Sequence, residues 1–206
     1  MVRSDEPLCA RSLAEAYLYL MVTPCSECGG GSLRGCTAMP VADLAEAAEP
    51  YSENRWLIDA VCKACKAESR LTVCIEPSST GSADDSIVIS PTDDPSVILD
   101  VGQWVVLFRM IEGAVASEPD KIRARELRLG AAACLDEALK FYDDPENDLP
   151  PSESVFCDAT AERMRQAPEQ FSRQRLLALR SKLPHASGVI TRVRADDPRH
   201  WWRTIP

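Results

Sequence analysis

The clearest chemistry in this 206-residue chain belongs to its cysteines, because four of the nine form two pairs with the same spacing. Two residues separate Cys25 from Cys28, and two residues separate Cys62 from Cys65. This spacing lets both sulfurs of one tight turn face a single ion, and the three glycines that follow Cys28 allow the chain to turn back beneath it. Two such turns would complete a tetrahedral metal site.

Short β-strands are predicted beside the second cysteine pair, at residues 56–61 and 71–75. Paired cysteines next to such strands resemble the zinc-ribbon family over residues 23–76. The resemblance implies that the four paired cysteines bind one structural zinc ion and that the other five cysteines are not ligands. The pairs lie further apart than in the commonest zinc sites. Residues 41–49 are therefore predicted to be a short acidic helix inserted at the tip of the first hairpin.

A site filled by four thiolates has no vacant position for water, so the predicted ion is structural and not catalytic. Zinc binding contributes about 10–16 kcal/mol in comparable small domains, which compensates for a small apolar core. Lys63 and Lys66 are expected to offset part of the negative charge of the site. Iron in a rubredoxin-like site is an alternative, because spacing does not select the ion. Unligated core cysteines or a redox dithiol form a second alternative, although neither pair begins a helix in a βαβ pattern.

The other five cysteines are interpreted mainly as packing residues. Cys134 lies on the apolar face of a predicted helix, Cys74 lies in a predicted strand, and Cys9 and Cys157 are isolated in sequence. Cys36 follows the first pair closely enough to compete for the metal, but it has no partner cysteine at the two-residue spacing.

The predicted fold class is α+β, with a helix that leads into the zinc-ribbon module and a C-terminal helical domain of about four helices packed with it. Apolar periodicity predicts these helices at residues 11–22, 95–115, 117–142, 158–165 and 168–182. Asp94 is the predicted N-cap of the second helix, and Ser117 to Asp120 is the predicted capping box of the third. The proposed divisions are a docking helix (1–22), the ribbon (23–76), a linker (77–95), the helical domain (96–183) and a tail (184–206). Further short strands are possible at 86–90 and 188–193.

Catalytic chemistry finds little support in the sequence. The chain has only two histidines, His185 and His200, and neither is near an evident acid or nucleophile. Nucleotide-binding glycine motifs and zinc-hydrolase motifs are missing from the sequence. We therefore expect neither an enzyme nor a small-molecule substrate. The apolar stretch at residues 16–22 lacks the basic flank of a signal peptide and the length of a membrane span, so we expect a cytoplasmic protein with no membrane partner.

Charge is distributed unevenly along the chain. The formal net charge is -9, with 23 basic and 32 acidic residues, which excludes a globally basic nucleic-acid-binding coat. Residues 163–203 nevertheless contain ten basic and three acidic side chains. The tandem tryptophans near the C-terminus would expose much apolar area, so they either fold back or dock on a partner. The candidate partner-binding residues are Arg163, Arg165, Arg173, Arg175, Arg180, Lys182, Trp201 and Trp202.

These features lead to two hypotheses of function. The first is a nonenzymatic, zinc-stabilised module for protein–protein interaction, or adaptor. The alternative is a nucleic-acid-binding accessory protein that uses the basic 163–203 region and the ribbon, although acidic residues of the ribbon would repel phosphates. Outside the ribbon the chain resembles a bacterial protein, and that likeness implies no mechanism.

Overall fold

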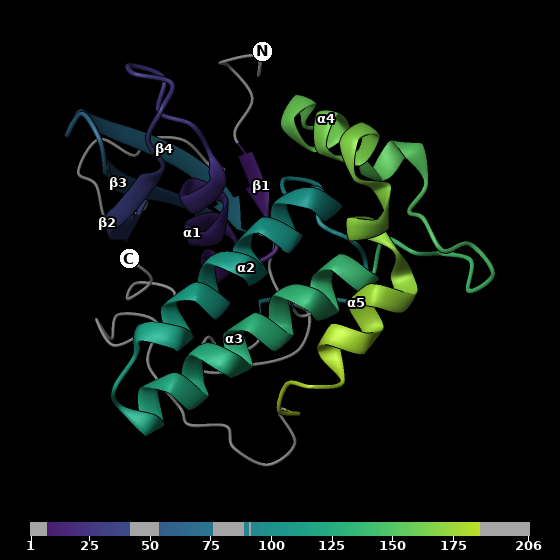
Figure 1. Ribbon diagram of the computed structural model, residues 1–206. Coiled ribbons are helices and arrows are strands. Elements are labelled where there is room, and N and C mark those ends of the chain that lie inside the picture. Colours follow the sequence, from purple (N-terminus) through teal and green to yellow (C-terminus); the bar gives the residue numbers. More distant parts are fainter. Residues whose placement is uncertain (1–7, 42–53, 76–88, 91, 186–206) are drawn as a thin grey trace. The chain divides into compact units, whose positions relative to one another are not determined.

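The computed structural model describes residues 8–41, 54–75, 89–90 and 92–185. The chain divides into two compact units, residues 1–81 and residues 82–206, and each is considered by itself. Within the described ranges, unit 1 contains a four-stranded sheet and one α-helix, and unit 2 contains four α-helices (Figure 1). The predicted mixture of helices and sheet is therefore present. The boundary between the units falls inside the 77–95 segment that the sequence marks as a linker.

The sheet of unit 1 has the strand order β1-β4-β3-β2. Its strands are β1 (Leu8–Ala10), β2 (Leu33–Pro40), β3 (Arg55–Cys62) and β4 (Glu68–Ile75). The pairs β2/β3 and β3/β4 are antiparallel, whereas β1 runs parallel to β4. β3 and β4 contain the two predicted strands and extend them.

The sequence did not predict β1 or β2. β1 has only three residues, too few to show an alternating pattern. β2 contains Gly35 and ends in Pro40, both residues that are depleted in strands, and its pairing with β3 is interrupted by a register shift between Gly35 and Thr37. Pairing with neighbouring strands, and not local propensity, therefore defines these two strands.

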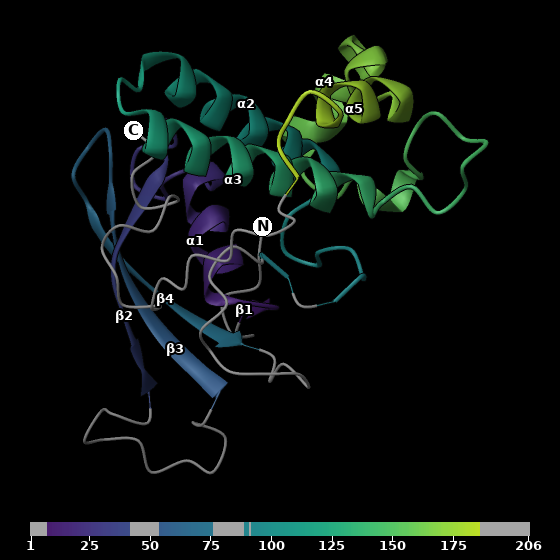
Figure 2. The same cartoon turned by 90° about the horizontal axis from the view of Figure 1, so that it is seen from below.

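Helix α1 (Leu13–Val22) packs against the sheet of its own unit (Figure 2). It begins two residues later than the sequence predicted, because the Ser12 side chain accepts a hydrogen bond from the Glu15 N–H and caps the helix. The approach of α1 to β2 is close at Gly35, where a Cβ atom would lie 2.3 Å from Cε1 of Tyr17. The Glu15 carboxylate and the Arg11 guanidinium, both buried, form an ion pair with an N–O distance of 2.6 Å.

In unit 2, α2 (Val101–Ser117) and α3 (Lys121–Leu139) form an antiparallel hairpin (Figure 1), and they lie within the ranges of two helices predicted from the sequence. The predicted start of the first helix at Asp94 and Pro95 is wrong. Asp100 is the N-cap and forms a reciprocal capping box with Gln103. The predicted capping box at Ser117 is also wrong, because Ser117 is still in α2 and Asp120 caps α3 by accepting from the Ile122 N–H.

The rest of unit 2 consists of short helices. These are η3 (Ser152–Ser154), α4 (Asp158–Gln166), η4 (Pro168–Phe171) and α5 (Arg173–Arg180). The single helix predicted over 168–182 is thus two elements, because Ser172 adopts an extended backbone and caps α5 by accepting from the Arg175 N–H. The Tyr142 hydroxyl donates to the Phe171 carbonyl at 2.5 Å and ties η4 to the end of α3.

One buried carboxylate connects α2 with α4. Asp100 is fully buried, and besides capping α2 it accepts hydrogen bonds from the Cys157 N–H and the Thr160 hydroxyl. Thr160 also packs directly on Gly102, where a Cβ atom would lie 2.3 Å from Cγ2 of the threonine. The start of α2 therefore fixes the position of α4.

Some predicted features lie outside the described residues. These are residues 42–49 of the acidic insertion, residues 86–88 of the possible strand at 86–90, the possible strand at 188–193, His200, Trp201 and Trp202. No helix in the described part of the chain has the length and apolar character needed to cross a membrane.

Candidate metal centre

The two cysteine pairs occupy turns with nearly the same backbone hydrogen bonds. In the first turn, the Cys25 carbonyl accepts from the Gly29 N–H at 2.8 Å. In the second, the Cys62 carbonyl accepts from the Lys66 N–H at 3.2 Å. The fourth residue after the first cysteine has a positive φ of 66° in both turns, as Gly29 in one and Lys66 in the other. Glycine adopts this conformation readily, whereas lysine does so at an energetic cost.

Each turn is also closed by a hydrogen bond from its first cysteine. The Cys25 N–H donates to the Gly31 carbonyl at 2.8 Å, and the Cys62 N–H donates to the Ala67 carbonyl at 2.9 Å. The Lys63 N–H then donates to the Ser32 carbonyl at 3.0 Å, which joins the second turn to the end of the first. The backbone thereby brings together two cysteine pairs that are far apart in the sequence.

The four cysteine sulfurs converge on one point. Their Sγ atoms all lie within 4.8 Å of one another. The Cys25–Cys65 sulfur distance is 3.8 Å and the Cys28–Cys62 sulfur distance is 3.7 Å. A regular tetrahedron with metal–sulfur bonds of about 2.3 Å has edges of about 3.8 Å. The four predicted ligands therefore form a cluster that can hold one metal ion.

Backbone N–H groups point at the sulfurs and change their acidity. Hydrogen bonds from the Gly30 N–H and the Cys65 sulfur are the main causes that lower the pKa of Cys28. The N–H of Cys65 outweighs burial and lowers the pKa of Cys62 to about 6. For Cys65 the Ala67 N–H lowers the pKa, but the contact with the Cys62 sulfur, burial and the other neighbouring sulfurs raise it to about 12. Four sulfurs this close cannot all be thiolates without a cation between them.

The site is closed on one side and open on the other. Cys25 and Cys62 are buried, at 3% and 0% exposure, whereas Cys28 and Cys65 are exposed. Gly31 packs against the buried side, where a Cβ atom would lie 2.6 Å from the Cys62 sulfur. From the sequence this glycine was assigned only to the turn that follows Cys28, whereas the structure requires the absence of a side chain there.

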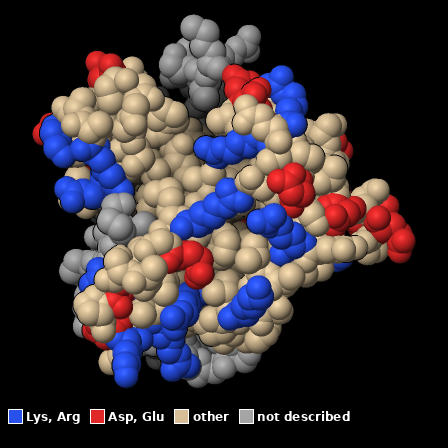
Figure 3. Space-filling model, viewed as in Figure 1, with Lys and Arg blue, Asp and Glu red and all other residues tan. Residues whose placement is uncertain are grey.

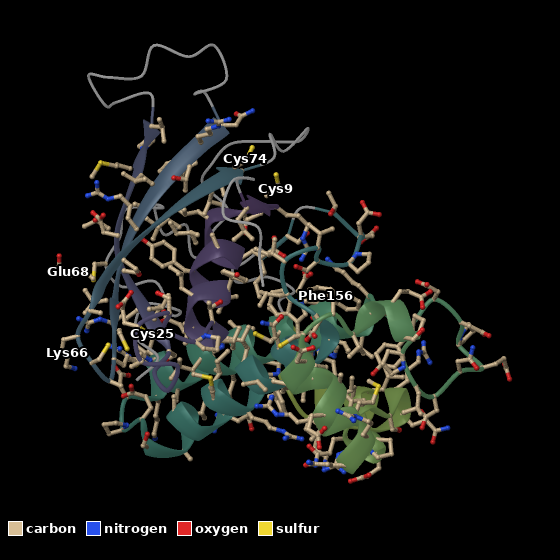
Figure 4. The ribbon with its side chains drawn as sticks, turned by 90° about the horizontal axis from the view of Figure 1, so that it is seen from above. Cys9, Cys25, Lys66, Glu68, Cys74 and Phe156 are labelled. Atoms are coloured by element: carbon tan, nitrogen blue, oxygen red, sulfur yellow. The ribbon has the colours of Figure 1, made fainter. Side chains whose placement is uncertain are left out.

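Basic groups lie close to the second turn. The Lys66 ammonium donates to the Lys63 carbonyl at 2.8 Å, and Figure 4 shows Lys66 at the same end of the sheet as Cys25. Burial, and secondarily the Arg34 charge, lower the pKa of Lys63. These groups supply positive charge on the side where a four-thiolate site would be negative.

The other five cysteines are not part of the four-sulfur cluster. Cys134 is fully buried within α3, where burial and then nearby acidic groups raise its pKa. Cys36 is exposed on β2 and its sulfur faces the Arg34 carbonyl, so it does not compete for the ion. Cys157 precedes α4 as its N-cap residue.

The predicted basic residues of unit 2 fall into two groups. Arg165 pairs with Glu162, and Arg180 pairs with Asp136 at 2.7 Å with its side chain 13% exposed. By contrast, Arg163 and Arg175 have no acidic side chain within ion-pair distance among the described residues. Arg173 begins α5, where its N–H donates to the Asp148 carbonyl, and Lys182 is exposed after that helix.

A third arginine near Arg163 and Arg175 was missed by the sequence analysis. Arg109 lies on α2 and donates to the Gln170 side chain at 2.8 Å. Partial burial, followed by the charges of Arg175 and Arg163, lowers the pKa of Arg109. The Arg109 guanidinium on α2 is therefore influenced by Arg163 on α4 and Arg175 on α5. Only the packing of these helices could reveal this, because Arg109 is more than 50 residues from the other two in sequence.

Comparisons of the chain with protein-family models, with curated proteins and with solved structures found no match.

Proposed function

We propose that this chain is a nonenzymatic interaction protein in which one structural zinc ion organises unit 1 and a basic surface of unit 2 binds an acidic partner protein. The proposal of a structural zinc ion rests on the convergence of four cysteine sulfurs at distances that suit a tetrahedral site. Four thiolates fill the coordination of zinc and leave no position for a reacting water. A role in folding follows, because such a site supplies binding energy that the small sheet lacks.

The test of the zinc proposal uses the full-length chain and one matched pair of variants. Cys62→Ser removes a buried ligand, whereas Cys36→Ser removes an exposed cysteine outside the cluster. We expect one zinc per chain in the wild type and in Cys36→Ser, and loss of the metal in Cys62→Ser. Hydrogen exchange is expected to show unprotected β3 and β4 amides in Cys62→Ser, with α2 and α3 still protected. Protected strands in that variant would show that the metal does not organise unit 1.

The proposed partner surface is built around Arg109, Arg163 and Arg175, and the exposed Lys182 that follows α5 is a further candidate basic group. Figure 3 shows Lys and Arg groups over α2, α3 and α5 with acidic groups between them. The arginines without acidic partners would gain charge-assisted hydrogen bonds from carboxylates of a partner protein. An acidic protein surface fits this arrangement of basic groups with acidic groups between them better than a nucleic-acid backbone does, because a nucleic acid needs a more continuous basic surface.

A charge-reversal pair tests this surface. Arg163→Glu with Arg175→Glu reverses charge inside it, and Lys121→Glu with Arg125→Glu makes the same change at exposed positions of α3. Affinity purification from native cells is expected to retain an acidic partner with the wild type and the α3 variant, and to lose it with the first variant. Fluorescence anisotropy with labelled DNA and RNA tests the alternative hypothesis of nucleic-acid binding. Tight, salt-sensitive binding lost in the first variant would favour the nucleic-acid hypothesis.

A further inference from the structure

Two cysteines outside the metal centre lie side by side in the sheet of unit 1. Cys9 on β1 and Cys74 on β4 are direct partners in the parallel pairing of these strands. They are far apart in the sequence, and the sequence analysis treated them as unrelated. Figure 4 labels both residues and shows their sulfur atoms at the same edge of the sheet.

Their side chains project from the same face. Side chains alternate between the two faces along a strand, and directly paired residues share a face. Ala10 and Val73, which neighbour the two cysteines, are fully buried in the core. Cys9 and Cys74 therefore point to the opposite face, where Cys9 is exposed and Cys74 is partly exposed.

The spacing of the strands suits a bond between the two sulfurs. Adjacent strands are separated by about 4.8 Å, which falls within the roughly 4.4–6.8 Å between Cα atoms of disulfide-bonded cysteines. Arg55 is the direct partner of Cys74 on β3, so a charged residue continues the same row across the sheet. Because Cys9 is exposed, a small polar oxidant can reach it.

We propose that Cys9 and Cys74 form a redox-active dithiol site that a hydroperoxide converts to a disulfide. The sulfur of Cys9, the more exposed of the two, attacks one peroxide oxygen, the O–O bond breaks, and one water leaves when the peroxide is hydrogen peroxide. Cys9 then carries a sulfenic acid. The sulfur of Cys74 attacks the Cys9 sulfur, the S–O bond breaks, and a second water carries away the oxygen with the thiol proton. The two thiols lose two electrons and two protons in total, and the peroxide is reduced to two waters.

Oxidation of Cys9 and Cys74 would constrain the chain of unit 1 without modifying the four metal-binding cysteines. A Cys9–Cys74 bond closes a loop that contains β2, β3 and all four metal-binding cysteines. Cys74 pairs with Arg55 at one end of β3, and Cys62 lies at the other end of that strand, a distance of roughly 23 Å for seven residues of strand. The bond would also fix β1, a three-residue strand at the edge of the sheet.

The test treats the full-length, metal-loaded chain with equimolar hydrogen peroxide and identifies disulfides by mass spectrometry of non-reduced tryptic peptides. We expect the loss of two hydrogen atoms per chain and a peptide pair joined through Cys9 and Cys74, reversed by a dithiol reductant. Cys9→Ser and Cys74→Ser should each abolish this pair. Cys36→Ser, which changes another exposed cysteine on an edge strand, should leave it unchanged.

The metal content of each sample is measured in parallel, so that a variant that fails to fold is recognised by its missing metal. Metal that stays bound while the Cys9–Cys74 pair forms would support the proposal. Sulfinic or sulfonic acid at Cys9 without a crosslink would overturn it. A disulfide between two chains, or one that joins Cys9 or Cys74 to a metal ligand, would overturn it equally.

Discussion

Replacement of Gly31 by alanine tests the metal centre through steric packing alone. A Cβ atom at this position would lie 2.6 Å from the Cys62 sulfur and 2.8 Å from Cβ of Ala64, with the Ala64 backbone nitrogen at 3.1 Å. The obstructing atoms are the Cys62 sulfur and atoms of Ala64 in the second turn, which cannot rotate away. The two turns must therefore separate, and the four sulfurs can no longer reach their tetrahedral spacing.

The size of the effect follows from the cost of overpacking, which is about 1–3 kcal/mol. Because the clash exists only when both turns are assembled around the ion, most of this energy appears as weaker metal binding. Each 1.4 kcal/mol corresponds to about tenfold in affinity, so zinc affinity should fall roughly 5- to 150-fold. Gly30→Ala is the matched control, because its nearest neighbour, the Cys28 carbonyl oxygen, would lie at 3.8 Å, an ordinary contact.

Competition with a chromophoric zinc chelator measures the affinities of the wild type and of both variants. We expect Gly30→Ala to match the wild type or to bind slightly more tightly, because alanine restricts the unfolded chain. Equal zinc affinities for Gly31→Ala and Gly30→Ala would refute the packing of the two turns described here.

Three further predictions concern the framework of the two units. Glu15→Ala leaves the buried Arg11 guanidinium without its carboxylate and should destabilise unit 1 by about 3–5 kcal/mol in chemical denaturation. Asp100→Ala removes the α2 cap and two acceptor contacts to the start of α4, and should cost about 2–4 kcal/mol, with α4 amides exchanging faster than those of α3. Hydrogen bonds, first among them one from the Ser172 side chain, hold the pKa of Asp148 below its ordinary value. The ionised Asp148 carboxylate therefore stabilises the fold at neutral pH, and this stabilisation is lost as the pH falls through the folded-state pKa. Asp148→Asn should therefore flatten the acid limb of the stability profile, and an unchanged limb would contradict this assignment.

The cysteine spacing was sufficient to predict which four cysteines lie together, because two residues between paired cysteines is a local constraint on one turn. The sequence could not show that Gly31 must lack a side chain or that Lys66 adopts a positive φ. The Gly31 requirement arises only when the second turn packs against the first. Lys66 takes the position that Gly29 occupies in the other turn, so the residue type at position 66 did not indicate a positive φ.

The helices show where local patterns mislead. Asp94 followed by proline is a good helix start by residue type, yet Asp100 caps α2 because its carboxylate is also buried against the start of α4. Likewise, β1 is a strand because β4 offers it a partner. Tertiary contacts, which are distant in the sequence, decide these boundaries. The same reason explains why Arg109 could not be grouped with Arg163 and Arg175 before the fold was known.

X-ray absorption at the zinc edge of the purified full-length chain, combined with elemental analysis of the same sample, tests the central claim most directly. The account predicts one zinc per chain with four sulfur neighbours at about 2.3 Å and no nitrogen or oxygen ligand. A sample that is stably folded without stoichiometric metal, or that binds its ion through fewer than four sulfurs, would contradict it.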